Sequence, residues 1–173
     1  MENQWYKEIE DKEILLQGDI INNCPIIIPP NTKYKKGEII TSEVEEYNVI
    51  IMSQSCDLVR KKIEFVLVSP IWTLGEFEKS SDFFKSRNGK NDLRNGFVFG
   101  YHLLDRCYDE QFNSDYLVVD FRFTFSISLD FLLQYIKNFN TRKRLNSPYR
   151  ERLSQAFGIF FMRVGLPVEI PEF

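Results

Sequence analysis

The chain has few of the residues from which metal centres, disulfide frameworks and histidine-based active sites are built. Its 173 residues include three cysteines, Cys24, Cys56 and Cys107, and a single histidine, His102. No Cys-x-x-Cys pair is present, and an odd, unpatterned set of cysteines argues against a disulfide-stabilised secreted fold. We therefore expect a cytoplasmic location, no cofactor and no metal.

Long apolar runs are also missing. No window approaches the roughly 18 consecutive apolar residues that a membrane helix needs, and the polar residues 1–10 do not form a signal-peptide pattern, so no membrane contact is expected. Apolar residues still make up 43% of the chain, and 16 residues are Phe, which is enough for a core. This length predicts one domain over residues 14–173, with a polar tail at 1–13 and an insertion near 75–96.

Charge is unevenly distributed along the chain. The net charge is −3, yet residues 121–173 hold 8 Lys and Arg against 4 Asp and Glu. A basic segment on an acidic protein is a suitable contact for a phosphate backbone or an acidic partner. The alternative is a solvated loop with charges spaced for solubility. The predicted binding site for RNA, DNA or a protein partner consists of Arg142, Lys143, Arg144, Tyr149, Arg150 and Arg152.

Short apolar runs bounded by polar turn residues predict a β-rich domain. The expected strands lie at 15–21, 48–53, 63–71, 97–104 and 116–125. Polar composition predicts a long loop at 29–46, and two glycines with almost no apolar residue predict a flexible loop at 85–96.

The clearest predicted element is an amphipathic helix near the C-terminus. Ser147 is a suitable N-cap, Pro148 suits the first turn, and Gly165 is a suitable stop. Apolar side chains on a second face of this helix would remain exposed and would mark a protein partner or a homodimer interface. The main apolar face repeats at helical spacing through Tyr149, Leu153, Phe157, Phe160 and Val164.

A polar segment, Ser53-Gln54-Ser55-Cys56-Asp57, follows the second predicted strand. Cys56 could be a nucleophile if a base such as His102 formed its thiolate, with Gln54 as an oxyanion donor. Cys56 could equally be a small buried apolar residue, and Asp57 suits a local Asx turn. A zinc site is a further alternative that the spacing does not favour; its candidate ligands are Cys56, Asp57, His102 and Cys107.

Three segments resemble the MazF/PemK growth-inhibitor toxins. Gln-Gly-Asp-Ile-Ile at 17–21 resembles the opening of their first strand. The runs at 49–54 and 66–71 are similar to their paired strands ending in Pro-Ile, and the segment from Arg144 to Leu166 is similar to their C-terminal helix. The resemblance implies an SH3-like, partly open barrel with a C-terminal amphipathic helix, a homodimer, and a role in a bacterial toxin–antitoxin-like system.

The chain departs from these toxins where they cleave RNA. The toxins place an Arg just before the second strand and a Thr or Ser just after Pro-Ile, where they stabilise charge on the attacked phosphate. Tyr47 and Trp72 hold these places here, and Thr73 comes one position late. Because a Tyr cannot replace a fixed positive charge, we expect a non-catalytic binding component. The alternatives are an endoribonuclease with a rearranged site and a Cys56-dependent enzyme.

The chain also resembles an uncharacterised family of bacterial proteins. The shared motifs are Ser-Gln-Ser-Cys-Asp-Leu at 53–58, Val-Val-Asp-Phe at 118–121 and Ser-Pro-Tyr-Arg-Glu-Arg-Leu at 147–153. This resemblance implies an association with bacterial defence, including defence against phages, and it implies no particular chemistry.

Overall fold

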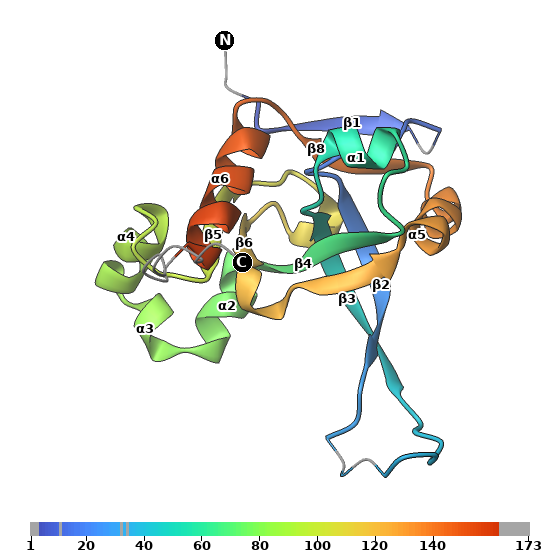
Figure 1. Ribbon diagram of the computed structural model, residues 1–173. Coiled ribbons are helices and arrows are strands. Elements are labelled where there is room, and N and C mark those ends of the chain that lie inside the picture. Colours follow the sequence, from blue (N-terminus) through green and yellow to red (C-terminus); the bar gives the residue numbers. More distant parts are fainter. Residues whose placement is uncertain (1–3, 11, 32, 34, 163–173) are drawn as a thin grey trace, which may run out of the picture.

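The chain folds into two antiparallel sheets with short helices around them (Figure 1). The structure is a computed structural model, and it describes residues 4–10, 12–31, 33 and 35–162. The expected β-rich α+β class is confirmed. In the described ranges the sheets do not close into a barrel, because the larger one runs from β2 at one end to β5 at the other.

The larger sheet has the strand order β2-β3-β4-β6-β5, and β7 also pairs with β4. Strand β4 organises this sheet because its nine residues are long enough for three partners: its first half pairs with β7, its middle with β3 and its end with β6. The strands are β2 (Ile20–Ile28), β3 (Glu43–Ile51), β4 (Phe65–Thr73), β5 (Tyr101–Arg106), β6 (Tyr116–Asp120) and β7 (Phe125–Ser128).

The smaller sheet pairs a strand near the start of the described chain with one that lies far along it. Strand β1 (Tyr6–Glu10) runs antiparallel to β8 (Thr141–Leu145), with Tyr6 opposite Leu145. The sequence predicts a polar tail over residues 1–13, but residues 6–10 of that segment form a strand. Most residues of β1 are charged, so the strand looks polar in the sequence. Two of its side chains, Tyr6 and Ile9, are nevertheless buried and attach the strand to the core.

The segment expected as a flexible loop at 85–96 contains a helix. Helices α2 (Leu74–Ser80), α3 (Asp82–Lys85) and α4 (Arg87–Arg94) follow β4 without a long break. The Ser86 hydroxyl accepts a hydrogen bond from the Gly89 N–H at 3.0 Å, which caps α4. Leu93 anchors the helix because it is buried in a small aromatic cluster with Phe77 and Phe84.

The strand predicted over 116–125 is also interrupted. The Asp120 carboxylate accepts a hydrogen bond from the Arg122 N–H at 3.0 Å and turns the chain through one 3-10 turn before β7 begins. The alternating phenylalanines in this segment therefore do not lie on a single strand. The expected loop at 29–46 is likewise shorter than predicted, because β3 already begins at Glu43.

The predicted C-terminal helix is confirmed as α6 (Tyr149–Phe161). Pro148, not the predicted Ser147, occupies the N-cap position, and it makes no side-chain capping hydrogen bond. The predicted stop at Gly165 lies outside the described residues. Two further helices, α1 (Ser55–Val59) and α5 (Leu129–Tyr135), complete the α-helices that Figure 1 labels. None of the described helices has the length and apolar character to cross a bilayer.

Gly18 joins the two sheets at the start of β2. Its N–H donates to the Ile51 carbonyl at 2.9 Å, and its own carbonyl accepts from the Leu145 N–H at 3.0 Å. Its φ of +82° favours glycine, and an added Cβ would also make a tight contact, 3.1 Å from the Cβ of Leu145. Gly18 is thereby hydrogen-bonded to β3 through its N–H and to β8 through its carbonyl.

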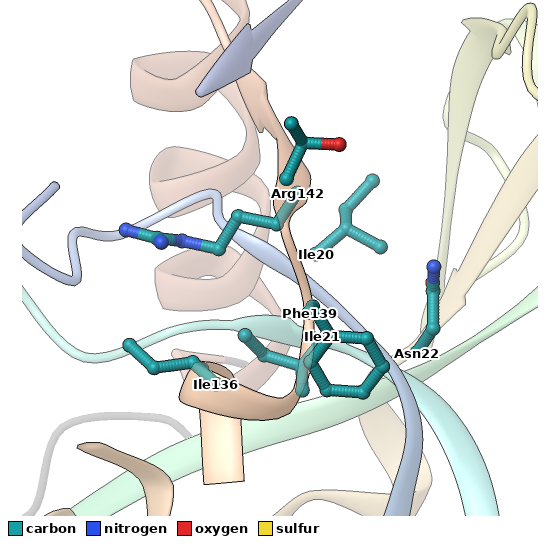
Figure 2. Close-up of a pocket in the computed structure, with 7 residues that line it drawn as sticks. Ile20, Ile21, Asn22, Ile136, Phe139 and Arg142 are labelled. Carbon is teal, nitrogen blue, oxygen red and sulfur yellow. The ribbon is translucent and has the colours of Figure 1, made fainter. Parts of the chain in front are cut away.

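A buried ionic cluster lies next to this junction. Asp19 has no exposed surface, and its carboxylate binds the guanidiniums of Arg142 and Arg144, with Arg142 Nε 2.9 Å from Oδ2. The remaining donors are used as well: Arg142 donates to the carbonyls of Glu10 and Glu13, and Arg144 donates to that of Ile14. Figure 2 shows the Arg142 guanidinium directed away from Asn22 and Phe139. One set of charges thus holds together the start of β2, the β1–β2 connection and β8.

Replacing Asp19 by Ala should destabilise the protein by about 3–5 kcal/mol, because two buried guanidiniums would lose their counter-charge. Urea unfolding followed by circular dichroism measures this change. Lys85→Ala, which removes the exposed ion pair between Lys85 and Asp82, is the control and should cost less than about 1 kcal/mol. Equal effects of the two substitutions would show that the cluster is not a main determinant of stability.

Candidate anion-binding groove

The structure divides the predicted basic site into buried and exposed parts. Arg142 and Arg144 are 6% and 4% exposed, and both bind Asp19. A phosphate backbone on the surface cannot reach them, so their predicted role in binding is wrong. Their function is to neutralise a buried carboxylate.

Three other members of the predicted site already have partners. Lys143 forms an ion pair with Glu8 at 2.8 Å, and Arg150 forms one with Glu151 at 2.7 Å. The Tyr149 ring is buried and stacks on Trp5 with a centroid distance of 3.8 Å and an interplanar angle of 12°. Tyr149 therefore does not offer an open face to a nucleobase, which corrects its predicted role.

Arg152 differs from its neighbours in the predicted site. It lies in the first turns of α6, is exposed, and forms no salt bridge with any other residue in the described part of the chain. It also lines a hollow of about 430 Å³ between α4, β5 and α6. We call this hollow the Arg152 groove; its main polar and aromatic lining residues are Trp5, Lys90, Asn91, Arg94, His102, Asp105, Tyr116 and Arg152.

The groove continues in two directions from Arg152. A hollow of about 240 Å³ extends along α6 towards Gly100 and Phe160, and it shares Arg152 and His102 with the groove. A larger, open hollow of about 1210 Å³ extends beneath β1 towards Tyr108 and shares Trp5, Asp105 and Arg152. Arg152 thus lies where three surface hollows meet.

The charges that line the Arg152 groove are mostly positive. Arg94 is exposed and has no salt-bridge partner among the described residues, while Lys90 is bound to Glu78 at 2.6 Å. Among the described residues, Asp105 is the carboxylate that lines the groove, and it accepts a hydrogen bond from the neighbouring Arg106 N–H at 2.8 Å. Sequence reasoning missed Lys90 and Arg94 because they belong to a segment that was expected to be a flexible loop.

His102 lies at the junction of the groove and the hollow along α6. Burial and, secondly, the positive charge of Arg152 together lower its pKa to about 4. The imidazole is therefore neutral at pH 7, and it is stacked over the Phe121 ring. A neutral imidazole can donate or accept a hydrogen bond, but with this pKa it is a weak general base.

The polar segment at 53–57 forms the start of α1. Cys56 is exposed, and its Sγ lies 3.7 Å from Asp57 Oδ1, while Gln54 donates to the Ser154 hydroxyl of α6 at 3.0 Å. No hydrogen bond or ion pair in the described part of the chain links Cys56 to His102. The structure therefore does not assemble the Cys56–His102 pair that a thiol enzyme would need.

The candidate zinc ligands are not brought together. Cys107 is buried, and its pKa is raised to about 12 by burial and by the nearby Asp109 carboxylate. In the described ranges, no three His, Cys, Asp or Glu side chains are placed so that they could hold one metal ion.

The residues that the expected resemblance would place at a cleavage site make other contacts. The Tyr47 ring meets the Trp72 ring edge-on at a centroid distance of 5.9 Å. The Thr73 hydroxyl accepts from the Glu76 N–H at 3.2 Å and donates to the Glu76 carboxylate at 2.9 Å, so it caps α2. Tyr47 and Trp72 therefore form an aromatic pair, and the Thr73 hydroxyl is engaged as a helix cap.

His102 should make folding stability depend on pH. Its pKa in the folded state is about 4, below the value of about 6.5 of an unfolded chain, so the unfolded state takes up the proton first. The contribution is fully present above pH 6.5 and decreases as the pH falls towards 4, by about 2 kcal/mol at pH 5. Urea unfolding of wild type and His102→Gln between pH 7.5 and 5 measures it, and parallel curves for the two proteins would contradict the assignment.

The three thiols should react at very different rates. Cys56 is exposed, whereas Cys24 and Cys107 are buried and burial raises the pKa of each to about 12. Ellman's reagent should therefore modify one thiol rapidly in the native protein and all three in urea, and Cys56→Ser should abolish the rapid phase. Rapid modification of two or more native thiols would show that the core is more accessible than described.

Compared with known proteins, the chain matches no family model, and no curated protein or solved structure is significantly similar to it.

Proposed function

We propose that this protein is a non-catalytic binding component that holds single-stranded nucleic acid in the Arg152 groove. The observation that carries the proposal is the position of Arg152, an exposed guanidinium without a salt-bridge partner in the described ranges, at the meeting point of three hollows. Arg94 adds a second such charge from α4. Two cations on different helices can contact successive phosphates of one strand.

Aromatic side chains beside these cations favour a nucleic acid over a simple anion. Tyr108 is 77% exposed in the open hollow beneath β1. The Tyr116 ring lines the groove with the Arg106 guanidinium 5.0 Å from its centroid. The exposed Tyr108 ring next to a cationic groove provides a stacking surface for an unpaired base, whereas the half-buried Tyr116 ring is already covered by Arg106. Hollows of several hundred Å³ are also the size that accommodates a base or nucleotide.

The side chains in and near the groove suit the binding of a ligand better than catalysis. His102 is neutral and weakly basic, Cys56 has no described contact with it, and Thr73 is used as a helix cap. Cleavage of RNA requires groups that move protons and stabilise charge on phosphorus. The arrangement offers cations for binding and no evident pair of proton-transfer groups.

The fold family and the cellular role of the protein belong to the same proposal. We propose an SH3-like, partly open barrel related to the MazF/PemK toxins, acting in the cytoplasm in bacterial defence or a toxin–antitoxin-like system. The support is the Gly18 junction that opens β2, the antiparallel β3–β4 pair and the C-terminal helix α6. The free state of all three cysteines is consistent with a reducing compartment.

Fluorescence anisotropy with a labelled 12-nucleotide RNA and the matching DNA tests the proposal. Arg152→Ala should weaken binding about tenfold at low salt, because a charged hydrogen bond is lost. The same substitution should also reduce the slope of log affinity against log salt by about 0.7, the value for one phosphate contact on a single strand. Arg94→Ala should behave similarly.

Matched control substitutions lie on the same two helices. Arg87→Ala on α4 and Arg150→Ala on α6 remove one positive charge each outside the groove and should leave affinity nearly unchanged. Equal losses for all four variants would indicate non-specific attraction and would contradict a groove-centred site. Cleavage of the RNA that disappears in Cys56→Ala or His102→Gln would contradict the non-catalytic part of the proposal.

A further inference from the structure

A further hollow, of about 540 Å³, lies between α1, α5 and the connection from β1 to β2. It shares no lining residue with the Arg152 groove. Its innermost side chains are almost completely buried, and exposed aliphatic side chains form part of its walls. We call it the aliphatic hollow; its main aliphatic lining residues are Ile14, Leu15, Leu58, Val59, Leu129 and Leu133.

Hydrogen bonds hold the walls of the aliphatic hollow in place. The Ile14 carbonyl accepts from the guanidiniums of Arg142 and Arg144, so this wall is attached to the buried ionic cluster. On the opposite wall, the Leu129 N–H at the start of α5 donates to the Glu64 carbonyl at 2.8 Å. The hollow is therefore formed before any ligand enters, and binding would not have to order it first.

The lining of the hollow is aliphatic apart from a few charged side chains. Leu15, Leu58 and Leu129 are buried, whereas Ile14 and Val59 are 61% and 50% exposed. The described residues that line it include no aromatic ring, hydroxyl or amide side chain. A ring system would find no stacking face here, and a polar ligand would find few hydrogen-bonding partners. An alkyl chain is the ligand part that this surface suits, because burial of apolar area drives its binding.

Positive charges surround the aliphatic hollow. Lys12, Lys61 and Lys137 come from its three sides, are exposed, and form no salt bridge with another residue in the described ranges. The carboxylate of the described lining, that of Glu13, already lies 3.5 Å from the Arg144 guanidinium. An anionic group at the opening would therefore meet three cations without acidic partners.

We propose that the aliphatic hollow binds a fatty carboxylate, with the alkyl chain against the leucines and the carboxylate beside the lysines. The volume of about 540 Å³ lies within the range of small-molecule sites, roughly 300–1,000 Å³. The proposal rests on the shape and charge of this hollow alone and is independent of the Arg152 groove.

Other anions match the hollow less well. A bilayer with anionic lipids has the same chemistry, but a flat surface would touch only the exposed walls and could not cover the buried leucines. A nucleic acid would be attracted by the lysines, yet its phosphates would gain nothing from the aliphatic lining. A single free chain can enter the hollow and use both features.

Isothermal titration calorimetry with octanoate, decanoate and dodecanoate tests the proposal on the full chain. One molecule should bind per chain, and affinity should rise about fourfold for each added methylene. Val59→Asp should weaken decanoate binding at least about tenfold, because a carboxylate would enter the aliphatic wall. Lys61→Gln/Lys137→Gln should weaken it about fivefold through the lost charges.

Val44→Asp is the matched control, because Val44 is a 62% exposed valine of β3 that does not line the hollow. This variant and Arg152→Ala should bind decanoate as wild type does. Retained affinity in Arg152→Ala separates this site from the one proposed for nucleic acid. Circular dichroism of each variant checks folding.

Three results would overturn the proposal. The first is no saturable binding of dodecanoate up to about 1 mM. The second is an equal loss of affinity in Val59→Asp and Val44→Asp, or an affinity that does not change with chain length. The third is co-sedimentation with phosphatidylglycerol vesicles that Val59→Asp abolishes, without saturable binding of the free carboxylates, which would assign the surface to a membrane instead.

Discussion

The rest of the structure depends on the pairing of Asp19 with Arg142 and Arg144. A carboxylate with no exposed surface is tolerated only when it is paired and hydrogen-bonded. The two arginines also satisfy carbonyls of the β1–β2 connection, so the start of β2 and strand β8 are held at one place. Gly18, next in sequence to Asp19, adds backbone hydrogen bonds to β3 and β8. The two sheets are therefore joined by neighbouring residues, one acting through charge and one through its backbone.

This junction also determines what is left for binding. Strand β8 leads directly into α6, and Trp5 from the start of β1 stacks on Tyr149 in the first turn of that helix. With β8 fixed and the helix start covered, Arg152 is directed towards β5 and α4 instead of towards the sheet junction. The basic run near the C-terminus thus has two roles: Arg142 and Arg144 stabilise the fold, and Arg152 is exposed at a groove.

Sequence reasoning succeeded where one pattern decides the structure. The apolar runs of β3 and β4 and the helical repeat of α6 were recognisable because burial alone determines their periodicity. Sequence reasoning failed where the contact that stabilises an element is polar or joins residues far apart in the sequence. Strand β1 is charged but anchored by Tyr6 and Ile9, and α4 depends on the Ser86 cap. Asp19 and Arg142 are 123 residues apart, so no local pattern showed that Arg142 is buried. Of the residues that line the proposed groove, the sequence patterns identify only Arg152 and His102 as candidates.

The central claim is that ligand contact occurs at the Arg152 groove and not at the rest of the basic run. Hydrogen exchange measured by mass spectrometry, with and without a single-stranded oligonucleotide, tests this directly because amides covered by ligand exchange more slowly. The account predicts added protection in α4, β5 and the first half of α6, with no change in β8, whose arginines are already buried. Protection confined to β8 or to α1 would contradict it.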